Sequence, residues 1–435
     1  MKPLLDVLVI LDALEKEGSF AAASAKLFKT PSALSYTIHR LESDLNIQLL
    51  DRSGHRARFT PSGQMLLEKG REVLHIAREL EIRAVKLQQG WENSLRLAVD
   101  STFPVALLSP PIAAFYQQQP LTRLHFTLNP SLLDWRPLTD GQADLLLERG
   151  RDEEAQAILR SLMQQRGFYP MVAAQRLGEE YTFRIDKASG TIDPALASGP
   201  EMARVRELMY WNMDNTARSE WANLVSSRTK SQQAQLARYA FDQHWWDLSV
   251  QATIAGKLWD QLEERFPLAY NDLFARYVSG KDIPQSYAMA IARQESAWNP
   301  KVRSPVGASG LMQIMPGTAT HTVSMFSIPG YSGPSQLLDP ETNINIGTSY
   351  LQYVYQQFGN NRIYASAAYN AGPGRVRSWQ GNSAGRIDAV AFVESIPFSE
   401  TRGYVKNVLS YDAYYRYFMG QQDKLFSDAE WRQRY

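Results

Sequence analysis

One carboxylate on an otherwise apolar helix face constrains how this chain can fold more than any other feature. Residues 287–291 form an apolar helical run. Glu295 follows Ile291 by four positions and Ala288 by seven, so the three side chains share one face. Such a face should be buried, where carboxylates rarely lie. This Glu is either paired with a base or held partly protonated, because desolvation raises its pKa. In the second case it is a general acid that works near neutral pH.

The composition describes a soluble globular protein and excludes several kinds of site. The chain has 435 residues, enough for about three domains, with 44% hydrophobic and 21% charged residues. Its net charge of +1 does not indicate a polyanionic partner for the whole chain, although a local basic patch could bind one. The lack of cysteine excludes disulfides, thiolate zinc sites and cysteine nucleophiles. The six histidines form no metal-binding motif, so we expect neither a metal nor another cofactor.

The first residues read as part of a folded domain and not as a targeting segment. The apolar run over residues 4–14 is interrupted by Asp6 and Asp12, and no small-residue cleavage site follows it. No stretch approaches the ~18 apolar residues of a membrane span. We therefore expect a cytoplasmic chain without a membrane span.

Residues 1–60 are expected to form three helices and a short basic β segment. Ser19 can cap the second helix and Thr30 the third. The third helix begins at Pro31, where the missing N–H is not needed. Its buried stripe is expected to consist of Leu34, Ile38, Leu41 and Leu45.

The exposed face of the third helix carries short polar groups, an aromatic ring and a cation, which suit the base edges of a DNA major groove. These candidate DNA contacts are Ser32, Ser35, Tyr36, His39 and Arg40. Residues 49–60 are expected to form a two-stranded basic wing. Its arginines, which could reach phosphates, are Arg52, Arg56 and Arg58. A helical bundle with a solvated basic loop is the alternative, but the order of elements favours a winged helix-turn-helix followed by a dimerising helix over 61–89.

The same region resembles the LysR-type transcriptional regulators. The matching motifs are Gly18-Ser19-Phe20-Ala21-Ala22-Ala23, Pro31-Ser32-Ala33-Leu34-Ser35-Tyr36, Arg40-Leu41-Glu42, Asp51-Arg52 and Thr60-Pro61-Ser62-Gly63. The resemblance implies a winged helix-turn-helix domain over 1–60, in which residues 31–43 form the helix that recognises DNA. It also implies a dimerisation linker helix over 61–90, through which two chains could form a homodimer.

Residues 91–141 look like the opening of that family's α/β effector domain. Strands are expected at 95–99 and 124–128, with a helix over 104–118 between them. The family pattern then stops, so only the start of one of two lobes is present. We expect a truncated fragment that cannot close a normal sheet, is partly disordered or packs on its neighbours, and forms no intact inducer site. The junction with the next part should lie within 140–151.

From residue 142 to 266, helix is expected to follow helix. The expected helices span 153–165, 171–179, 202–211, 216–227, 232–241 and 248–258. Short turns separate them, which is typical of an α-superhelical array whose members bury their apolar stripes against neighbours. The aromatic residues of this segment are interpreted mainly as packing residues, with stacking on a sugar as the less favoured alternative. They are Trp211, Trp221, Trp245 and Trp246.

The last domain, residues 267–435, contains Glu295 and no obvious second catalytic carboxylate. An ordinary glycosidase needs two carboxylates, one as the acid and one as the nucleophile or base. With a single Glu, a hydroxyl of the sugar itself can attack after the Glu has protonated the leaving oxygen. The Glu then takes the proton of that hydroxyl. An apolar wall must keep it neutral at rest, and the candidates for this wall are Ile291, Met312, Met315 and Tyr369.

Four motifs, in this order, resemble the soluble lytic transglycosylases of family one. They are Glu295-Ser296, Gly310-Leu311-Met312-Gln313, Ala368-Tyr369-Asn370 and Glu400 ahead of Tyr404. The resemblance implies a lysozyme-like α+β catalytic domain that binds the glycan strands of peptidoglycan. It implies cleavage of the β-1,4 bond between N-acetylmuramic acid and N-acetylglucosamine, which leaves a 1,6-anhydromuramic end. Carried over, Glu295 is the general acid and then the base.

The resemblance also assigns roles to the residues around Glu295. The glycan would be bound by Ser304, Gln313, Met315, Tyr369 and Asn370. Glu400 would orient the N-acetyl or peptide portion, and Tyr404 is a weaker candidate for supporting the site. The alternatives are that Gln313 and Asn370 are helix caps and that Glu400 is a surface acid paired with Arg402.

The expected chain is mainly α. It joins a winged helix-turn-helix and linker helix to a truncated α/β fragment, an α-superhelical segment and a lysozyme-like α+β domain. The transglycosylases of that family have a signal peptide and a long N-terminal superhelix that closes into a ring. In this chain a DNA-binding domain replaces them, and only the last part of the helical array is present. The favoured function is a peptidoglycan lytic transglycosylase fused to a LysR-type DNA-binding domain. The alternative is a sequence-specific transcriptional regulator that carries the transglycosylase part as a passenger of an accidental gene fusion.

Overall fold

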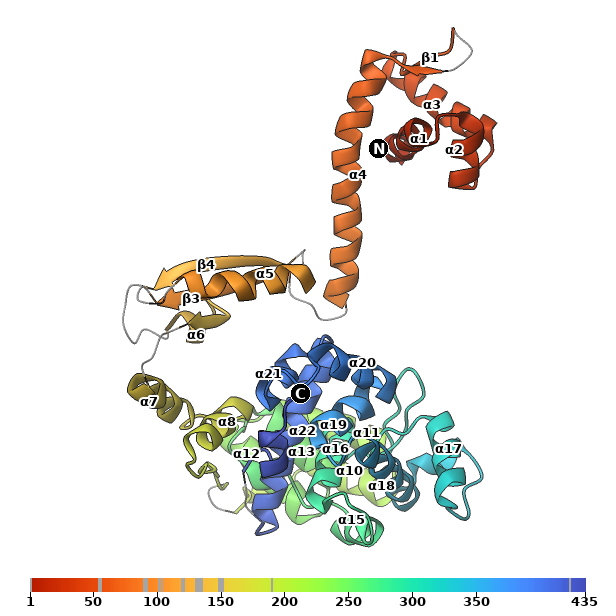
Figure 1. The fold of residues 1–435 in the computed structure, drawn as a ribbon. Helices are drawn as coiled ribbons and strands as arrows, with labels where there is room; N and C mark the ends of the chain where they lie inside the picture. Colours follow the sequence, from red (N-terminus) through yellow and green to blue (C-terminus); the bar gives the residue numbers. More distant parts are fainter. Residues whose placement is uncertain are drawn as a thin grey trace. The chain divides into compact units, whose positions relative to one another are not determined.

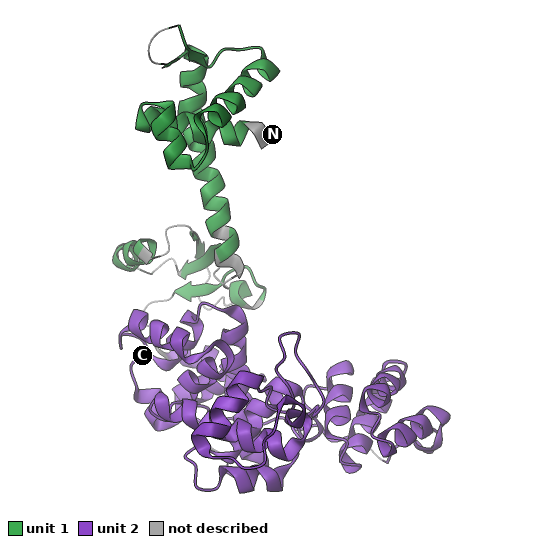
Figure 2. Cartoon of the chain, turned by 90° about the vertical axis from the view of Figure 1, so that its right-hand side faces the viewer, with its two compact units in different colours: residues 1–149 green, residues 150–435 purple. Residues whose placement is uncertain are grey.

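The computed structural model describes residues 2–53, 57–88, 93–100, 103, 105–118, 122–129, 136–147, 152–188, 191–421 and 424–435. The chain divides into two compact units, residues 1–149 and residues 150–435 (Figure 2). Helices dominate the described residues, so the prediction of a mainly α chain is confirmed (Figure 1). No helix within these ranges is long and apolar enough to cross a membrane.

Unit 1 begins with a winged helix-turn-helix. Its elements are α1 (Lys2–Glu17), α2 (Phe20–Leu27), α3 (Pro31–Leu45), β1 (Leu50–Asp51), β2 (Arg58–Phe59) and α4 (Pro61–Gln88). The hydroxyls of Ser19 and Thr30 cap α2 and α3, as the sequence predicted, because each accepts a hydrogen bond from the backbone N–H three residues further on. The two short strands pair antiparallel and form the wing.

A buried carboxylate connects α3 to the wing. Glu42 Oε1 accepts hydrogen bonds from the backbone N–H groups of Leu49, at 2.8 Å, and Leu50, at 3.1 Å. The predicted stripe of α3 is buried at three of its four positions. Leu45 is the exception: it is 50% exposed, because it is the last residue of the helix.

The second part of unit 1 is a small α/β layer. Its elements are β3 (Ser94–Asp100), η1 (Val105–Leu108), α5 (Ser109–Gln118), β4 (Arg123–Asn129), α6 (Arg136–Thr139) and β5 (Leu145–Leu147). We expected that this fragment could not close a sheet, and that expectation is wrong. A three-stranded parallel sheet forms in the order β4-β3-β5, because β5 supplies a partner for the second edge of β3. The sheet therefore continues to residue 147, beyond residue 141.

Unit 2 begins with an array of helices. They are α7 (Asp152–Leu162), α8 (Phe168–Leu177), α9 (Pro194–Ser198), α10 (Pro200–Tyr210), α11 (Asp214–Ser226), α12 (Lys230–Asp242), α13 (Trp246–Ala255) and α14 (Leu262–Arg265). Trp221 is fully buried at the centre of α10–α13, and its indole N–H donates to the Leu248 carbonyl at 2.9 Å. Trp245 packs against Trp221, and Trp246 stacks on His244. Trp211 does not follow the packing interpretation, because its side chain is exposed.

The rest of unit 2 surrounds one buried helix, α16 (Figure 1). The elements are α15 (Asn271–Val278), α16 (Gln285–Ser296), α17 (Pro316–Phe326), η2 (Pro334–Leu338), α18 (Pro340–Gln357), α19 (Arg362–Ala371), α20 (Pro373–Ser383), α21 (Ala389–Ser395), α22 (Ser399–Phe418) and α23 (Asp428–Arg432). Tyr287 of α16 packs on Tyr355 of α18 and hydrogen-bonds Ser366 of α19. The described β structure of this domain consists of isolated bridges from Ser309 to Arg303 and to Ile314.

A buried arginine connects the last helices of unit 2. The Arg362 guanidinium donates two hydrogen bonds to Glu430, at 2.7 and 2.9 Å, and a third to Asp412. All three side chains are almost fully buried. Burial alone would raise the pKa of Glu430, but the attraction of Arg362 outweighs it and holds that pKa below its ordinary value. The cluster therefore fixes α22 and α23 on the start of α19.

We expect Arg362→Leu to destabilise unit 2 by about 3–5 kcal/mol, because it leaves two buried carboxylates without a cation. Urea unfolding followed through tryptophan fluorescence would measure the change. The matched control is Arg276→Leu, which removes an exposed ion pair with Glu341 and should cost less than about 1 kcal/mol. Equal effects of the two substitutions would contradict the prediction.

Candidate active site

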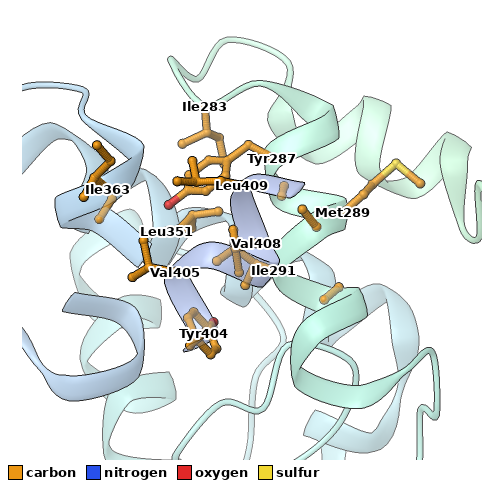
Figure 3. Close-up of a cluster of buried hydrophobic side chains, with 14 of the residues drawn as sticks. Ile283, Tyr287, Met289, Ile291, Leu351, Ile363, Tyr404, Val405, Val408 and Leu409 are labelled. Carbon is orange, nitrogen blue, oxygen red and sulfur yellow. The ribbon is translucent and has the colours of Figure 1, made fainter. Parts of the chain in front are cut away.

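Glu295 lies in the last turn of α16, on a helix whose residues 287–292 are fully buried. Figure 3 shows Ile291 of this helix meeting Val408 of α22, with Tyr404 at one end of the same cluster. After α16 the backbone turns through Ala297 and Trp298, whose φ values of 48° and 68° are left-handed. The buried Trp298 indole donates to the Tyr415 hydroxyl of α22 at 3.0 Å. The backbone that carries Glu295 is therefore fixed against α22.

Burial controls the charge of Glu295. It raises the pKa of this carboxyl from 4.5 to about 7. The Tyr404 hydroxyl acts in the opposite direction, because it donates a hydrogen bond of 2.7 Å to Oε1. The negative charge of Glu400 raises the pKa further. At neutral pH the group is divided between acid and carboxylate, so it can both give and take a proton.

Tyr404 has a closer relation to Glu295 than the sequence indicated. We expected it only as a weaker supporting residue, yet its hydroxyl contacts the carboxylate directly. Its side chain is 5% exposed. Burial and the charge of Glu295 raise the pKa of the phenol well above 10.0, so the phenol remains a hydrogen-bond donor at neutral pH.

Tyr369, from α19, is the second phenol of the site. Its hydroxyl donates to the Met312 carbonyl at 2.7 Å, and its ring lies 5.4 Å from the ring of Tyr350, measured between centroids. Burial raises its pKa well above 10.0, and the next cause is the charge of Glu295. Tyr369 is therefore close enough to Glu295 for the charge of that carboxylate to act on its hydroxyl.

The turn over 307–316 is shaped by one glycine and one buried asparagine. Gly310 has a φ of +80°, and a Cβ there would lie 2.1 Å from the Leu337 carbonyl oxygen, so a side chain does not fit. The Asn343 amide of α18 donates to the carbonyls of Ser309 and Leu337 and accepts from the Met312 N–H, each at 2.8 Å. Sequence reasoning missed Asn343. The signal that could have identified it is an amide side chain next to the apolar Ile344 and Ile346 in a helical segment.

Two predicted glycan contacts stabilise their own loop. The Gln313 amide donates to the carbonyls of Val302, at 3.1 Å, and Gly310, at 2.9 Å, so it is not a helix cap. The Ser304 hydroxyl accepts from the Ala308 N–H at 3.0 Å. Met315, which precedes α17, is partly exposed and available for a ligand.

Asn370 and Glu400 belong to two helices that approach each other near Glu295. The Thr401 hydroxyl donates to Asn370 Oδ1 at 2.6 Å and so links the end of α19 to the start of α22. Asn370 is therefore not a helix cap. Glu400 is exposed in the first turn of α22, close enough for its charge to act on Glu295. Thr401 was missed, although it follows Glu400 directly in the motif.

The predicted DNA-binding residues lie in a different place, on unit 1. Most of those on α3 are exposed, and Ser35 is half-buried; the set is Ser32, Ser35, Tyr36, His39 and Arg40. Arg52 is less available, because its Nη1 donates to His39 Nε2 at 2.7 Å and lies 3.5 Å from Glu42 Oε2. Arg58 is exposed on β2, and Arg56 lies outside the described residues.

Among the residues that the structure describes, neither site gathers metal ligands. Within the described ranges, no group of three His, Cys, Asp or Glu side chains could hold a metal ion. The Glu295 carboxyl, which accepts a hydrogen bond from the Tyr404 phenol, is a group that can transfer a proton near neutral pH.

Known families match both units. The lysR family of bacterial regulatory helix-turn-helix proteins matches residues 5–64. The soluble lytic murein transglycosylase L domain matches residues 195–262, and the transglycosylase SLT domain matches residues 272–392. The soluble lytic transglycosylase helical domain matches residues 395–423.

Individual relatives divide the chain in the same way. A soluble lytic murein transglycosylase of Salmonella typhimurium is 85% identical over 294 residues, which are 68% of this chain and 46% of the relative. The uncharacterized HTH-type transcriptional regulator YeeY of Escherichia coli is 69% identical over 147 residues, which are 34% of this chain and 48% of YeeY. The solved 70 kDa soluble lytic transglycosylase SLT70 of Escherichia coli is 82% identical, with a TM-score of 0.66, over 70% of this chain and 49% of that one.

The chain is a fusion of a LysR-type part and a soluble lytic transglycosylase part. Both resemblances drawn from the sequence motifs are thereby confirmed. The fusion spans about half the length of each of these two curated relatives. The two alignments cover 68% and 34% of the fusion.

The raised pKa of Glu295 predicts how the stability of the transglycosylase part depends on pH. Its folded pKa of about 7 lies above the ordinary 4.5, so the stability that the protonated group contributes is complete below pH 4.5 and is lost as pH rises through 7. Glu295→Gln keeps a neutral group there. At pH 8 this variant should be more stable than the wild type by about 3 kcal/mol at most.

Thermal unfolding at pH 4.5 and pH 8 measures this difference. The gap between variant and wild type should be small at the lower pH and large at the higher one. The control is Glu341→Gln, at an exposed carboxylate, whose effect should change little with pH. A gap for Glu295→Gln that does not vary with pH would contradict the prediction.

Proposed function

We propose that unit 2 is a peptidoglycan lytic transglycosylase. It cleaves the β-1,4 bond between N-acetylmuramic acid and N-acetylglucosamine and leaves 1,6-anhydromuramic ends. The observation that carries this proposal is the state of Glu295, a carboxyl with a pKa of about 7 that accepts a hydrogen bond from Tyr404. The high identity to a soluble lytic murein transglycosylase supports the same substrate class.

The reaction needs one carboxyl in two protonation states. Protonated Glu295 gives its proton to the glycosidic oxygen, and the bond from that oxygen to the anomeric carbon breaks. The C6 hydroxyl of the muramic sugar then attacks the anomeric carbon, and the Glu295 carboxylate takes the proton of that hydroxyl. The acid is restored and no water is consumed. Since the pKa lies near neutral pH, the acid needed for the first half of the cycle and the carboxylate needed for the second are both accessible.

The surrounding residues divide into those that tune Glu295 and those that bind the sugar. Tyr404 stabilises the carboxylate formed after the first proton transfer, and Tyr369 excludes water beside it. In this proposal the glycan contacts Met315, together with the turn that Gln313 and Ser304 stabilise. Asn370, on α19, and Glu400, on α22, interact with the N-acetyl or peptide groups.

Digestion of purified sacculi with the full chain tests the proposal. The products should carry anhydro ends, lighter by one water than hydrolysis products, as read by mass spectrometry. Glu295→Gln should lower the rate by at least about 100-fold, because the variant cannot transfer a proton. Glu341→Gln should act like the wild type. Reducing ends among the products would sink the mechanism.

A second function is favoured by the geometry of unit 1. We propose that the winged helix binds DNA through the exposed face of α3 as a homodimer paired through α4. Exposed apolar residues recur on α4 at spacings of three and four, as Val73, Ile76 and Leu80. A second copy of α4 could cover this stripe, and two recognition helices would then read two half-sites. If unit 2 is inactive, the chain is a regulator with a passenger from an accidental gene fusion.

A gel-shift against genomic fragments tests DNA binding. The wild type should select a subset of fragments, and Tyr36→Ala with Arg40→Ala should weaken that selection by at least about tenfold, because two base-edge contacts are lost. Arg78→Ala, an exposed charge on α4, is the control and should keep the selectivity. Selection that survives the double substitution unchanged would count against the proposal.

A further inference from the structure

Two large aromatic side chains are exposed side by side at the end of α10. Tyr210 is 75% exposed and Trp211 is 62% exposed, and their rings lie 5.2 Å apart in an edge-to-face pair. The Trp211 indole N–H donates to Glu207 Oε1 at 2.8 Å, which fixes the orientation of the ring. Trp221, by contrast, is fully buried. An oriented, exposed aromatic face is suited to stacking on a flat ligand such as a sugar ring.

A cavity of about 710 Å³ begins at the residue after Trp211. One wall is formed by residues 212–216, where the chain turns from α10 into α11, and the other by residues 299 and 301–303 together with Leu338. Cavities of this size accommodate one or two sugar rings.

The cavity is lined by amides and by an excess of positive charge. The Asn212 side chain has no hydrogen-bond partner among the described residues, and Asn299 uses only its oxygen, which accepts from the Lys301 N–H at 2.9 Å. Within the same ranges neither Lys301 nor Arg303 forms an ion pair, and Asp214 is the single acid of the lining. Such a lining offers amide donors to hydroxyl and acetamido oxygens and two cations to a carboxylate.

One wall of this cavity is continuous with the candidate active site. The Val302 carbonyl accepts hydrogen bonds from the Gly310 N–H, at 2.9 Å, and from the Gln313 amide, at 3.1 Å. The wall therefore leads directly from the end of α16 into the loop that contains Ser304. The cavity and the candidate active site therefore share this loop.

We propose that Trp211, at the end of α10, and the cavity beside it form a second glycan subsite. This subsite binds a part of a long strand that is distant from the bond that is cleaved. The proposal rests on the transglycosylase function of unit 2. Trp211 stacks on a sugar ring of the strand, and the amides of Asn212 and Asn299 bind its acetamido and hydroxyl oxygens. Lys301 and Arg303 bind the carboxylates of the attached peptide. Short glycans fill the Glu295 site without reaching this subsite.

Kinetics on two substrates test the proposal. Trp211→Ala in the full chain should raise KM for long glycan strands by about tenfold with kcat unchanged, and should leave KM for a tetrasaccharide unchanged. Trp211→Phe keeps a flat ring and should retain most of the affinity. Equal KM values of wild type and Trp211→Ala on long strands would overturn the proposal, and so would an equal loss on both substrates.

The cationic part of the subsite has its own control. Lys301→Gln with Arg303→Gln should raise KM for long strands with intact peptides more than for strands from which an amidase has removed the peptides. Lys230→Gln with Lys257→Gln makes the same change of charge at a different cavity and should have no such effect. Equal loss on strands with and without peptides would overturn the carboxylate assignment.

A binding experiment distinguishes failure of the transglycosylase proposal from failure of the glycan-subsite proposal. If the wild type does not cleave sacculi, co-sedimentation with sacculi measures binding directly in the Glu295→Gln background. Weaker sedimentation on Trp211→Ala would then support the subsite, and unchanged sedimentation would overturn it.

Discussion

The contact between α16 and α22 determines the chemistry available to unit 2. Burying the apolar face of α16 also leaves Glu295 half-buried and its carboxyl poorly hydrated, and the same packing brings the Tyr404 hydroxyl within 2.7 Å of it. Burial raises the pKa of Glu295 and the hydrogen bond from Tyr404 lowers it, so that the pKa lies near neutral pH. Neither effect arises from Glu295 itself. The hydrogen bond comes from α22, whose position in turn depends on the Arg362 cluster and on the Trp298 to Tyr415 hydrogen bond.

Much of the fold could be predicted from local patterns, and much of the site could not. Helical periodicity located six helices of the array over 142–266 to within a few residues, and the spacing from Ile291 indicated that Glu295 lies on a buried face. The partner of Glu295 was harder to rank, because Tyr404 is 109 positions away and only tertiary packing joins them. Asn343 was missed for the same reason. The sheet of unit 1 was misjudged because three residues sufficed for β5, too few to show a periodic pattern.

Each part of the fusion keeps the contacts that its candidate site requires. The winged helix has its own apolar core, and Glu42 connects that core to the wing. The transglycosylase part has a continuous core that includes both α8 and α22, so its catalytic end does not depend on unit 1. The chain spans only about half of each of these two relatives, yet both candidate sites keep the packing around them. Physical coupling between the two sites is not needed to explain either.

The short sheet of unit 1 bears on how the purified fusion behaves at high concentration. In the described part of the chain β4 and β5 each pair only with β3, so neither has a second strand partner, although the Leu124 N–H of β4 donates to the Tyr116 hydroxyl. β4 also exposes Phe126 and Leu128, and β5 exposes Leu145. An unpaired apolar edge is a template to which a strand of another chain can add. The fragment thus gives the molecule a route to aggregation that is separate from the α4 stripe, and its two edges are where an added lysine would block strand addition.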